Sequence, residues 1–334
     1  MARYISDQNK VVLRHESGTY ASASGNGIWI GQVTDSSVSD AENVLVNRYL
    51  GTASRSWGST EPGPRDVTGT LTFNAQDMRI PFFAIGSVFD VSGTASQHTA
   101  TQVNTDTAQS GYTSGTLNPP FSFTLEDSKQ APGTGKNFVR TINGVVPTSV
   151  TLTASQGEKV VVSMDYIGQT LTFSSGTTTS VTEPTNRPYL WSDSLLTLAG
   201  SVINTAKEVS LEINQNMEPP HYLNGSRDIS VPFPQNREYT LSVTMDMDAD
   251  SGNLLYDDLY KSNGSFNATF ALNASTSAGS QEAFFVFSGC RIVETPDIPS
   301  PNEGVNEVTF SIMPQNVTGS SIDSSTATAT YNPW

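Results

Sequence analysis

The residues best placed to bind a metal ion form an aspartate-rich run, MDMDADSGNLLYDD, at residues 245–258. Asp246, Asp248 and Asp250 alternate before a glycine, as oxygen ligands do in calcium-binding loops. Gly252, however, stands one position later than such a loop requires, and no bidentate glutamate closes the run. The pattern therefore predicts no metal site.

A related segment earlier in the chain supports this interpretation. Asn74 and Gln76 stand there at the positions of Asp246 and Asp248. The position thus requires polar groups on a solvated face, not carboxylates for a cation. We expect no metal and no cofactor.

Groups suited to nucleophilic catalysis are equally scattered. His15, His98 and His221 lie far apart, and none stands in a recognisable motif with a serine or cysteine nucleophile. No glycine-rich phosphate loop occurs. Asp257 and Asp258 are most simply the solvated face of a short helix. The sequence predicts no catalytic residues and a protein that is not an enzyme.

The single cysteine, Cys290, excludes an intramolecular disulfide and any multi-cysteine metal site. It follows Gly289 in a strand pattern, so we expect a small buried side chain there. The formal net charge of −15 argues against a basic patch that grips nucleic-acid phosphates, although DNA could still slide past such a surface. No stretch approaches the length of a membrane span, so no membrane insertion is expected.

The elements that must position these residues occur twice, in the same order. Each repeat has a polar loop that leads into a strand, a short apolar helix, two strands joined by a turn, and a closing strand. Gly144 and Gly289 are matched glycines in the third block. The paired blocks are residues 49–73 and 222–245, 77–87 and 253–263, 121–147 and 266–294, and 157–168 and 304–314.

This order predicts a mainly β chain of two tandem domains, each a β-sandwich or half-barrel with one short helix. Pro81 shortens the first helix. A Ser/Thr/Gln/Gly-rich insert at about residues 88–120 is expected to be a long surface loop or a partly ordered arm. The expected boundaries are an N-terminal arm at 1–32, a first domain at 33–173, a linker at 174–200, a second domain at 201–318 and a C-terminal tail at 319–334.

Two stretches resemble a known family. HESGTYAS, at residues 15–22, is similar to the opening motif of tail tube proteins from long-tailed, siphovirus-like phages and archaeal viruses, although its glycine precedes the Thr-Tyr pair. KEVSLEINQNMEPP at residues 207–220, with YLNGSRD and YTLSVTMDMD after it, looks like the segment that builds the tube wall and the ring-to-ring loop of that family. The order of elements in each repeat resembles the same domain.

The resemblance implies a structural protein of the virion tail, assembled in the host cytoplasm. Such proteins stack as rings of six domains around a DNA-sized lumen, so a duplicated chain needs three copies for a pseudo-sixfold ring. The implied partners are further copies of the chain, a tape-measure protein and viral DNA in the lumen, and other tail proteins at the tube ends. From the net charge we expect an acidic, polar lumen.

Two other classes remain open. A carbohydrate- or receptor-binding β-sandwich at a tail tip or cell surface would also be rich in threonine, but it should cluster aromatic residues in loops. Trp29, Trp57, Trp191 and Trp334 are instead scattered. A hydrolase on a β scaffold would need a carboxylate pair, for which Asp257 and Asp258 are the weak candidates.

The two duplicated loops, residues 49–65 and 222–237, are the expected contact between adjacent rings. They are long for hairpin connections, and they keep a Tyr-Leu start and an arginine end while their middles carry apolar groups. The alternative is that these apolar groups fold back onto their own sheet. The expected contact residues are Tyr49, Leu50, Trp57, Arg65, Tyr222, Leu223, Val231, Phe233 and Arg237.

Overall fold

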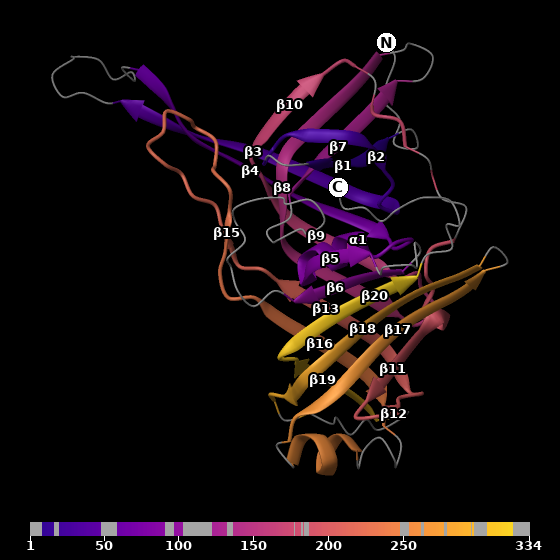
Figure 1. Ribbon diagram of the computed structural model, residues 1–334. Helices are drawn as coiled ribbons and strands as arrows, with labels where there is room; N and C mark the ends of the chain where they lie inside the picture. The colour runs from indigo at the N-terminus through magenta and orange to yellow at the C-terminus, as the bar shows by residue number, and fades with distance from the viewer. Residues whose placement is uncertain are drawn as a thin grey trace.

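The computed structural model confirms a mainly β chain (Figure 1). The structure describes residues 9–16, 20–47, 59–90, 97–102, 122–131, 136–176, 178–181, 183, 187–247, 254–261, 264–276, 279–294, 296 and 306–322.

A long antiparallel sheet runs through both repeats. Its strands, in spatial order, are β3 (Gln32–Asn47), β4 (Ser59–Asn74), β9 (Val161–Gly168), β8 (Lys136–Ser155), β13 (Ala206–Asn214), β16 (Glu238–Asp246), β19 (Glu307–Met313) and the end of β18 (Gly279–Ile292). The repeats meet where β8 pairs with β13, from Ser149 opposite Asn214 to Ser155 opposite Glu208. The sheet is therefore continuous across the middle of the chain.

Two shorter sheets pair with the other ends of β8 and β18. The first has the order β2 (Ala23–Ile28), β1 (Lys10–Glu16), β7 (Phe123–Ala131), β8 and β10 (Thr170–Ser174). The second has the order β12 (Ser201–Val202), β11 (Ser194–Leu198), β17 (Phe266–Thr276), β18 and β20 (Asn316–Ile322). Alternating apolar residues of the strands fill one shared core.

The strand order of the first half recurs in the second. β3, β4, β9 and β8 pair in the same sequence as β13, β16, β19 and β18, and even an irregularity recurs: the register shifts between Val33 and Asp35 in β3, and between Ala206 and Glu208 in β13. The repeated blocks thus correspond to a repeated topology. The domain boundaries stay a prediction, because one sheet joins both halves.

The matched glycines mark the corners at which β8 and β18 pass between sheets. Gly144 and Gly289 both have φ +65°, a left-handed conformation that favours glycine. Before the corner each strand pairs within a shorter sheet, and after it within the long sheet.

The two expected helices are present and short. α1 (Arg79–Ile85) and the π-helix η3 (Leu254–Lys261) precede β5 and β17. Pro81 lies in the first turn of α1, where a backbone amide has no intrahelical acceptor in any case. α1 is buried between the halves: the Phe82 ring meets Phe285 edge-on at 5.7 Å, and the Phe83 ring lies 6.3 Å from Phe123.

The described part of the insert at 88–120 forms strands. β5 (Gly86–Asp90) and β6 (Gln97–Gln102) form a hairpin, and β6 pairs with β20 of the second half. The unpaired edge of β20 explains this, because a short strand from the first half satisfies its backbone groups. The other residues of the insert, 91–96 and 103–120, lie outside the described part of the chain.

The β3–β4 hairpin projects far from the body, and the chain around β15 (Phe233–Pro234) runs beside it (Figure 1). β15 pairs with β14 (Met217–Glu218). No helix among the described residues is long and apolar enough to cross a membrane.

Candidate functional site: the polar sheet face and the projecting hairpin

One face of the long sheet is lined by hydroxyl groups, and we call it the polar face. The opposite face carries core residues such as Leu71, Leu211 and Leu241. Hydroxyls of neighbouring strands meet across the polar face, in the oxygen pairs Ser37–Thr70 at 2.7 Å, Thr72–Ser163 at 3.3 Å, Thr153–Ser210 at 3.2 Å, Ser242–Ser311 at 3.4 Å and Thr244–Thr309 at 2.9 Å.

Charged groups on the polar face are mainly acidic. Glu208 and Glu212 are exposed, and Asp165 accepts a hydrogen bond from Ser149 at 2.9 Å. The ammonium group of Lys207 lies 2.6 Å from Asp246 and 2.8 Å from Glu307. Hydrogen bonds to these two carboxylates raise the pKa of Lys207. The lysine therefore stays protonated, and the negative charges of Asp246 and Glu307 balance its positive charge.

Asp246, the first aspartate of the aspartate-rich run, is therefore paired with Lys207. Residues 248–250 of that run lie outside the described part of the chain. Among the residues that are described, no group of three or more histidine, cysteine, aspartate or glutamate side chains could hold a metal ion.

A glycine in β4 allows a buried tyrosine to reach across the sheet. Tyr166 of β9 is 2% exposed, and its hydroxyl donates to the Ser37 carbonyl at 3.1 Å. A Cβ atom at Gly69 would lie 2.3 Å from that hydroxyl. Burial raises the pKa of Tyr166, so the group remains a neutral donor.

β3 forms one edge of the long sheet. Within the described residues β3 pairs only with β4, whereas its counterpart β13 pairs with β16 on one side and β8 on the other. An open strand edge presents unpaired backbone donors and acceptors, which invite pairing with another chain.

The projecting hairpin is held by the second half. Arg227 donates from Nε to the Gly63 carbonyl at 3.0 Å and pairs with Glu42, while the Arg65 amide donates to the Arg227 carbonyl at 3.0 Å. His221 adds a contact of 3.0 Å to Asp66. The second duplicated loop thus lies along the first hairpin of its own chain.

The predicted contact residues fall into separate groups. Tyr222, Leu223, Val231 and Phe233 are all exposed, and Leu223 is fully exposed at 110%. Tyr49, Leu50 and Trp57 lie outside the described residues. The structure therefore leaves the inter-ring role of this set a prediction.

The two arginines are anchors with different partners. Arg65 donates to both Asp40 oxygens at 2.6 Å and to the Leu171 carbonyl at 2.9 Å, and these hydrogen bonds lower the pKa of Asp40. Arg237 donates to the Ile85 carbonyl, at the end of α1, at 2.7 Å. The expectation that Arg65 ends a loop was wrong, because β4 already begins at Ser59.

Sequence reasoning missed an apolar group on the hairpin. Val44, Leu45 and Val46 are 48%, 50% and 40% exposed. Three consecutive apolar residues cannot all face one core from a strand, and this break in alternation was the available signal.

The HESGTYAS motif forms a clasp on the Gly144 corner. One oxygen of Glu16 accepts hydrogen bonds from the Gly144 amide and the Thr124 hydroxyl, both at 2.7 Å, and the other accepts the Ala21 amide at 2.8 Å. The Tyr20 hydroxyl donates to the Gly144 carbonyl at 3.0 Å. The motif therefore has a structural role.

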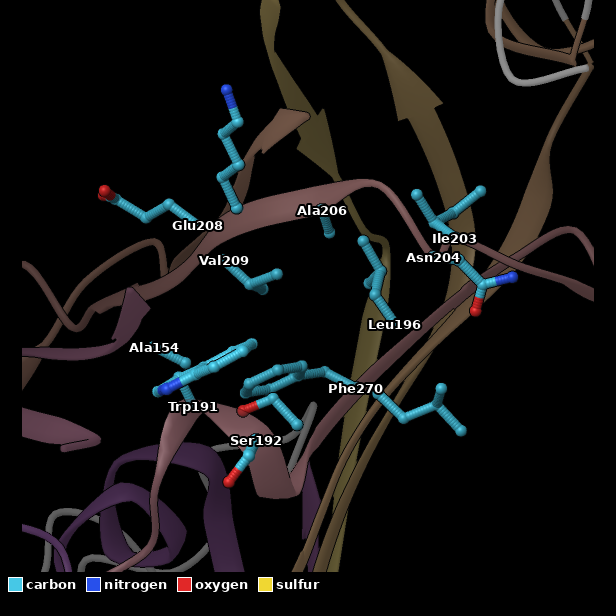
Figure 2. Close-up of a pocket in the computed structure, with 13 residues that line it drawn as sticks. Ala154, Trp191, Ser192, Leu196, Ile203, Asn204, Ala206, Glu208, Val209 and Phe270 are labelled. Carbon is cyan, nitrogen blue, oxygen red and sulfur yellow. The ribbon is translucent and has the colours of Figure 1, made fainter. Parts of the chain in front are cut away.

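A cavity of about 170 Å³ opens between the two sheets of the second half (Figure 2). Trp191 and Phe270 lie on one side and Val209 and Leu196 on the others, while the Glu208 side chain points away. The lining is apolar near its centre, and no set of polar groups converges there to bind a substrate.

The sequence profile of a family described as phage tail tube protein matches residues 16–281. The chain belongs to the phage tail tube protein family. This assignment spans both halves, from the Glu16 clasp to β18, and it identifies the protein as a structural component of the virion tail. A comparison with curated proteins finds no match.

Proposed function

We propose that three copies of this tail tube protein close into a ring, that rings stack into a tube, and that the tube conducts viral DNA from the capsid to the host cell. The observation that carries the proposal is the β8–β13 junction. It joins two topologically equivalent halves through the edge of β13, and the equivalent edge of β3 has no partner strand among the described residues.

The internal junction gives a template for the contact between copies. The shared register shifts align Asp35 of β3 with Glu208 of β13. Residues 35–41 would therefore pair with the chain that follows β18 in a neighbouring copy, as residues 208–214 pair with β8. Such a head-to-tail contact forms a closed ring when three successive rotations return to the first copy, and an open filament when they do not.

The polar face would line the lumen. Its paired hydroxyls and excess of carboxylates offer DNA few cations to bind, so phosphate groups could pass without releasing counterions. The family assignment and the charge of −15 support this orientation. A lumen lined by several lysines and arginines per copy would contradict it.

The hairpin and the adjoining loop would provide the contact between stacked rings. Val44, Leu45 and Leu223 present apolar surface on elements that project from the body. Burying such apolar surface against another subunit is favourable in free energy. Rings of a Leu45→Ser and Leu223→Ser double variant should form but not stack.

Negative-stain and cryo-electron microscopy of the purified full chain test the proposal. Tubes or rings with three copies per layer and an approximate sixfold outline are expected. Monomers that never associate, or rings of six copies, would contradict it. A tape-measure protein in the lumen and other tail proteins at the tube ends are further expected partners. The family assignment does not favour a receptor-binding module instead.

Two proline variants isolate the β3 edge. Adjacent residues of a strand direct their amides to opposite edges, and proline removes the amide. Of Ser36→Pro and Ser37→Pro, one should therefore disturb the pairing of β3 with β4, and the other only the open edge. The variant that keeps its circular dichroism spectrum should not form rings, and normal tubes from it would rule out pairing through β3.

A further inference from the structure

The chain that enters the second half is docked on the first half by backbone pairing. The Tyr189 amide donates to the Ala75 carbonyl at 2.9 Å, and the Tyr189 carbonyl accepts from the Val160 amide at 2.9 Å. Lys159 and Leu190 form an antiparallel bridge, and Tyr189 itself is 2% exposed. Residues just before β11 thus fasten the second half to its neighbour.

This docked segment is stiffened locally. Arg187 donates to both oxygens of Asp193, at 2.6 and 2.9 Å, and Asp193 also accepts the Leu190 amide at 2.8 Å. The 3-10 helix η2 (Trp191–Asp193) follows, and the Trp191 amide donates to the Glu158 carbonyl at 3.0 Å. Trp191 then lines the cavity at the seam (Figure 2).

The second half has the same acceptor site. The Met247 amide donates to the Asn306 carbonyl at 2.8 Å, as the Ala75 amide donates to the Val160 carbonyl at 2.9 Å. Within the described residues, the Met247 carbonyl and the Asn306 amide have no hydrogen-bond partner, and Asn306 is exposed. These two groups correspond to those that bind Tyr189.

Strand register identifies the segment that fits this site. Leu13 of β1 faces Leu125, Leu198 of β11 faces Ala268, and both facing residues directly follow a register shift at equivalent positions. β1 and β11 therefore align with Leu13 on Leu198. Counting back nine residues from each places Tyr4 on Tyr189 and Ile5 on Leu190.

The local sequences agree with this register at the Tyr-aliphatic pair. Residues 3–7 read Arg-Tyr-Ile-Ser-Asp, and residues 187–193 read Arg-Pro-Tyr-Leu-Trp-Ser-Asp. In this register the pairs Tyr4-Ile5 and Tyr189-Leu190 coincide, whereas the arginines and the Ser-Asp pairs are each displaced by one position.

We propose that Tyr4 and Ile5 of one copy dock on Met247 and Asn306 of the neighbouring copy, as Tyr189 and Leu190 dock on Ala75 and Val160 within the chain. The inference rests on the proposed ring, and it adds a second contact beside the β3 edge. In the internal example, the docked segment leads into the half that follows the half on which it docks. The half that follows the second half is the first half of another copy, and residues 4 and 5 lead into that first half through β1. A second copy is therefore the occupant.

Engineered disulfides test the contact. Val305 corresponds to Lys159, so the proposed partner of Ile5 is Val305. Facing residues of antiparallel strands have Cα separations that a disulfide can span. The Ile5→Cys and Val305→Cys double variant should oxidise to covalent trimers on a non-reducing gel. The only native cysteine, Cys290, is buried and should not interfere.

Mixing single variants separates contacts between copies from contacts within one. Ile5→Cys protein mixed with Val305→Cys protein should give a disulfide-linked dimer. A double variant that yields only monomers with an internal disulfide would overturn the proposal, as would a mixture without dimers. The Lys159→Cys and Leu190→Cys double variant is the matched control, because it should close within the chain.

A side-chain variant gives an independent measurement. Tyr4→Ala should raise the protein concentration needed for tube formation by about tenfold, while Tyr4→Phe should restore most of the assembly. Both should keep the thermal unfolding of the unassembled chain. If the parent chain forms tubes but neither disulfides nor Tyr4→Ala have these effects, the docking proposal fails while the proposed function stands. If the parent chain forms no rings, the proposed function fails.

Discussion

Gly144 and Gly289 occupy equivalent corners of β8 and β18, and both have φ +65°. In each case the backbone amide of a glutamine donates to the carbonyl of the residue before the glycine. Gln169 donates to Asn143 at 2.9 Å, and Gln315 donates to Ser288 at 3.0 Å. The two halves thus share the backbone device that turns a strand from one sheet into the other.

Alanine at either corner should destabilise the fold. A Cβ atom at Gly144 would lie 2.8 Å from the Tyr20 ring, and one at Gly289 would lie 2.8 Å from the Gln315 Cβ atom, in addition to the strained φ. We expect a loss of about 2–3 kcal/mol in the free energy of unfolding, measured with denaturant. Gly157→Ala is the control, because its φ is +84° but no atom lies within 4 Å. An equal loss there would show that strain alone decides the effect.

Gly69→Ala should displace Tyr166 from its place beneath β4. The added Cβ atom would lie 2.3 Å from the tyrosine hydroxyl and 2.4 Å from the Ser37 carbonyl oxygen, so we expect a loss of about 1–3 kcal/mol in unfolding free energy. Tyr166→Phe in the Gly69→Ala background should recover little of it, because the ring carbon Cζ would still lie 2.4 Å from the added Cβ atom. Gly176→Ala, whose nearest neighbour would lie 3.6 Å away, should be close to neutral.

Stability should depend on pH through His15. Burial, and secondarily the charge of Arg79, lower the pKa of His15 from 6.5 to about 3. The unfolded chain therefore binds a proton that the folded chain does not, and stability is lost as pH falls from 6.5 towards 3. Between pH 6.5 and 5 we expect a loss of about 2 kcal/mol, which His15→Gln should largely abolish. Parallel curves for both proteins would contradict the assignment.

Loss of Arg227 should release the loop from the hairpin. Arg227→Ala removes the bonds to the Gly63 carbonyl and to Glu42. The Arg227 and Glu42 side chains are both exposed, so global stability should change by less than about 1 kcal/mol. Hydrogen exchange should rise in residues 219–232, and chymotrypsin should cut faster at Tyr222. Arg291→Ala, which removes an exposed cation on β18 at the opposite end of the long sheet, is the control. Unchanged exchange would mean that other contacts hold the loop.

Alternation and turn residues were sufficient to predict the β class, the repeated order of elements and the matched glycines, because these depend on local patterns. The continuous sheet was not predictable in this way, since β8 reads alike whether its partner is β9 or β13. The β5–β6 hairpin was missed because Ser/Thr/Gln-rich strands at a sheet edge bury little apolar surface.

The candidate surfaces were likewise only partly predictable from local sequence patterns. Exposure of Tyr222 and Leu223 follows from their place in a polar loop. The attachment of that loop to the hairpin depends on Arg227 and Glu42, which lie 185 residues apart, and no local pattern links them.

The pairing of β6 with β20 has a consequence for synthesis. β6 emerges from the ribosome more than 200 residues before its partner, so the edge hairpin of the first half must wait until the last strand has been made. The chain therefore cannot finish folding from its N-terminal portion alone. Products truncated before β20 would lack the strand that pairs with β6, and their sheet would be incomplete.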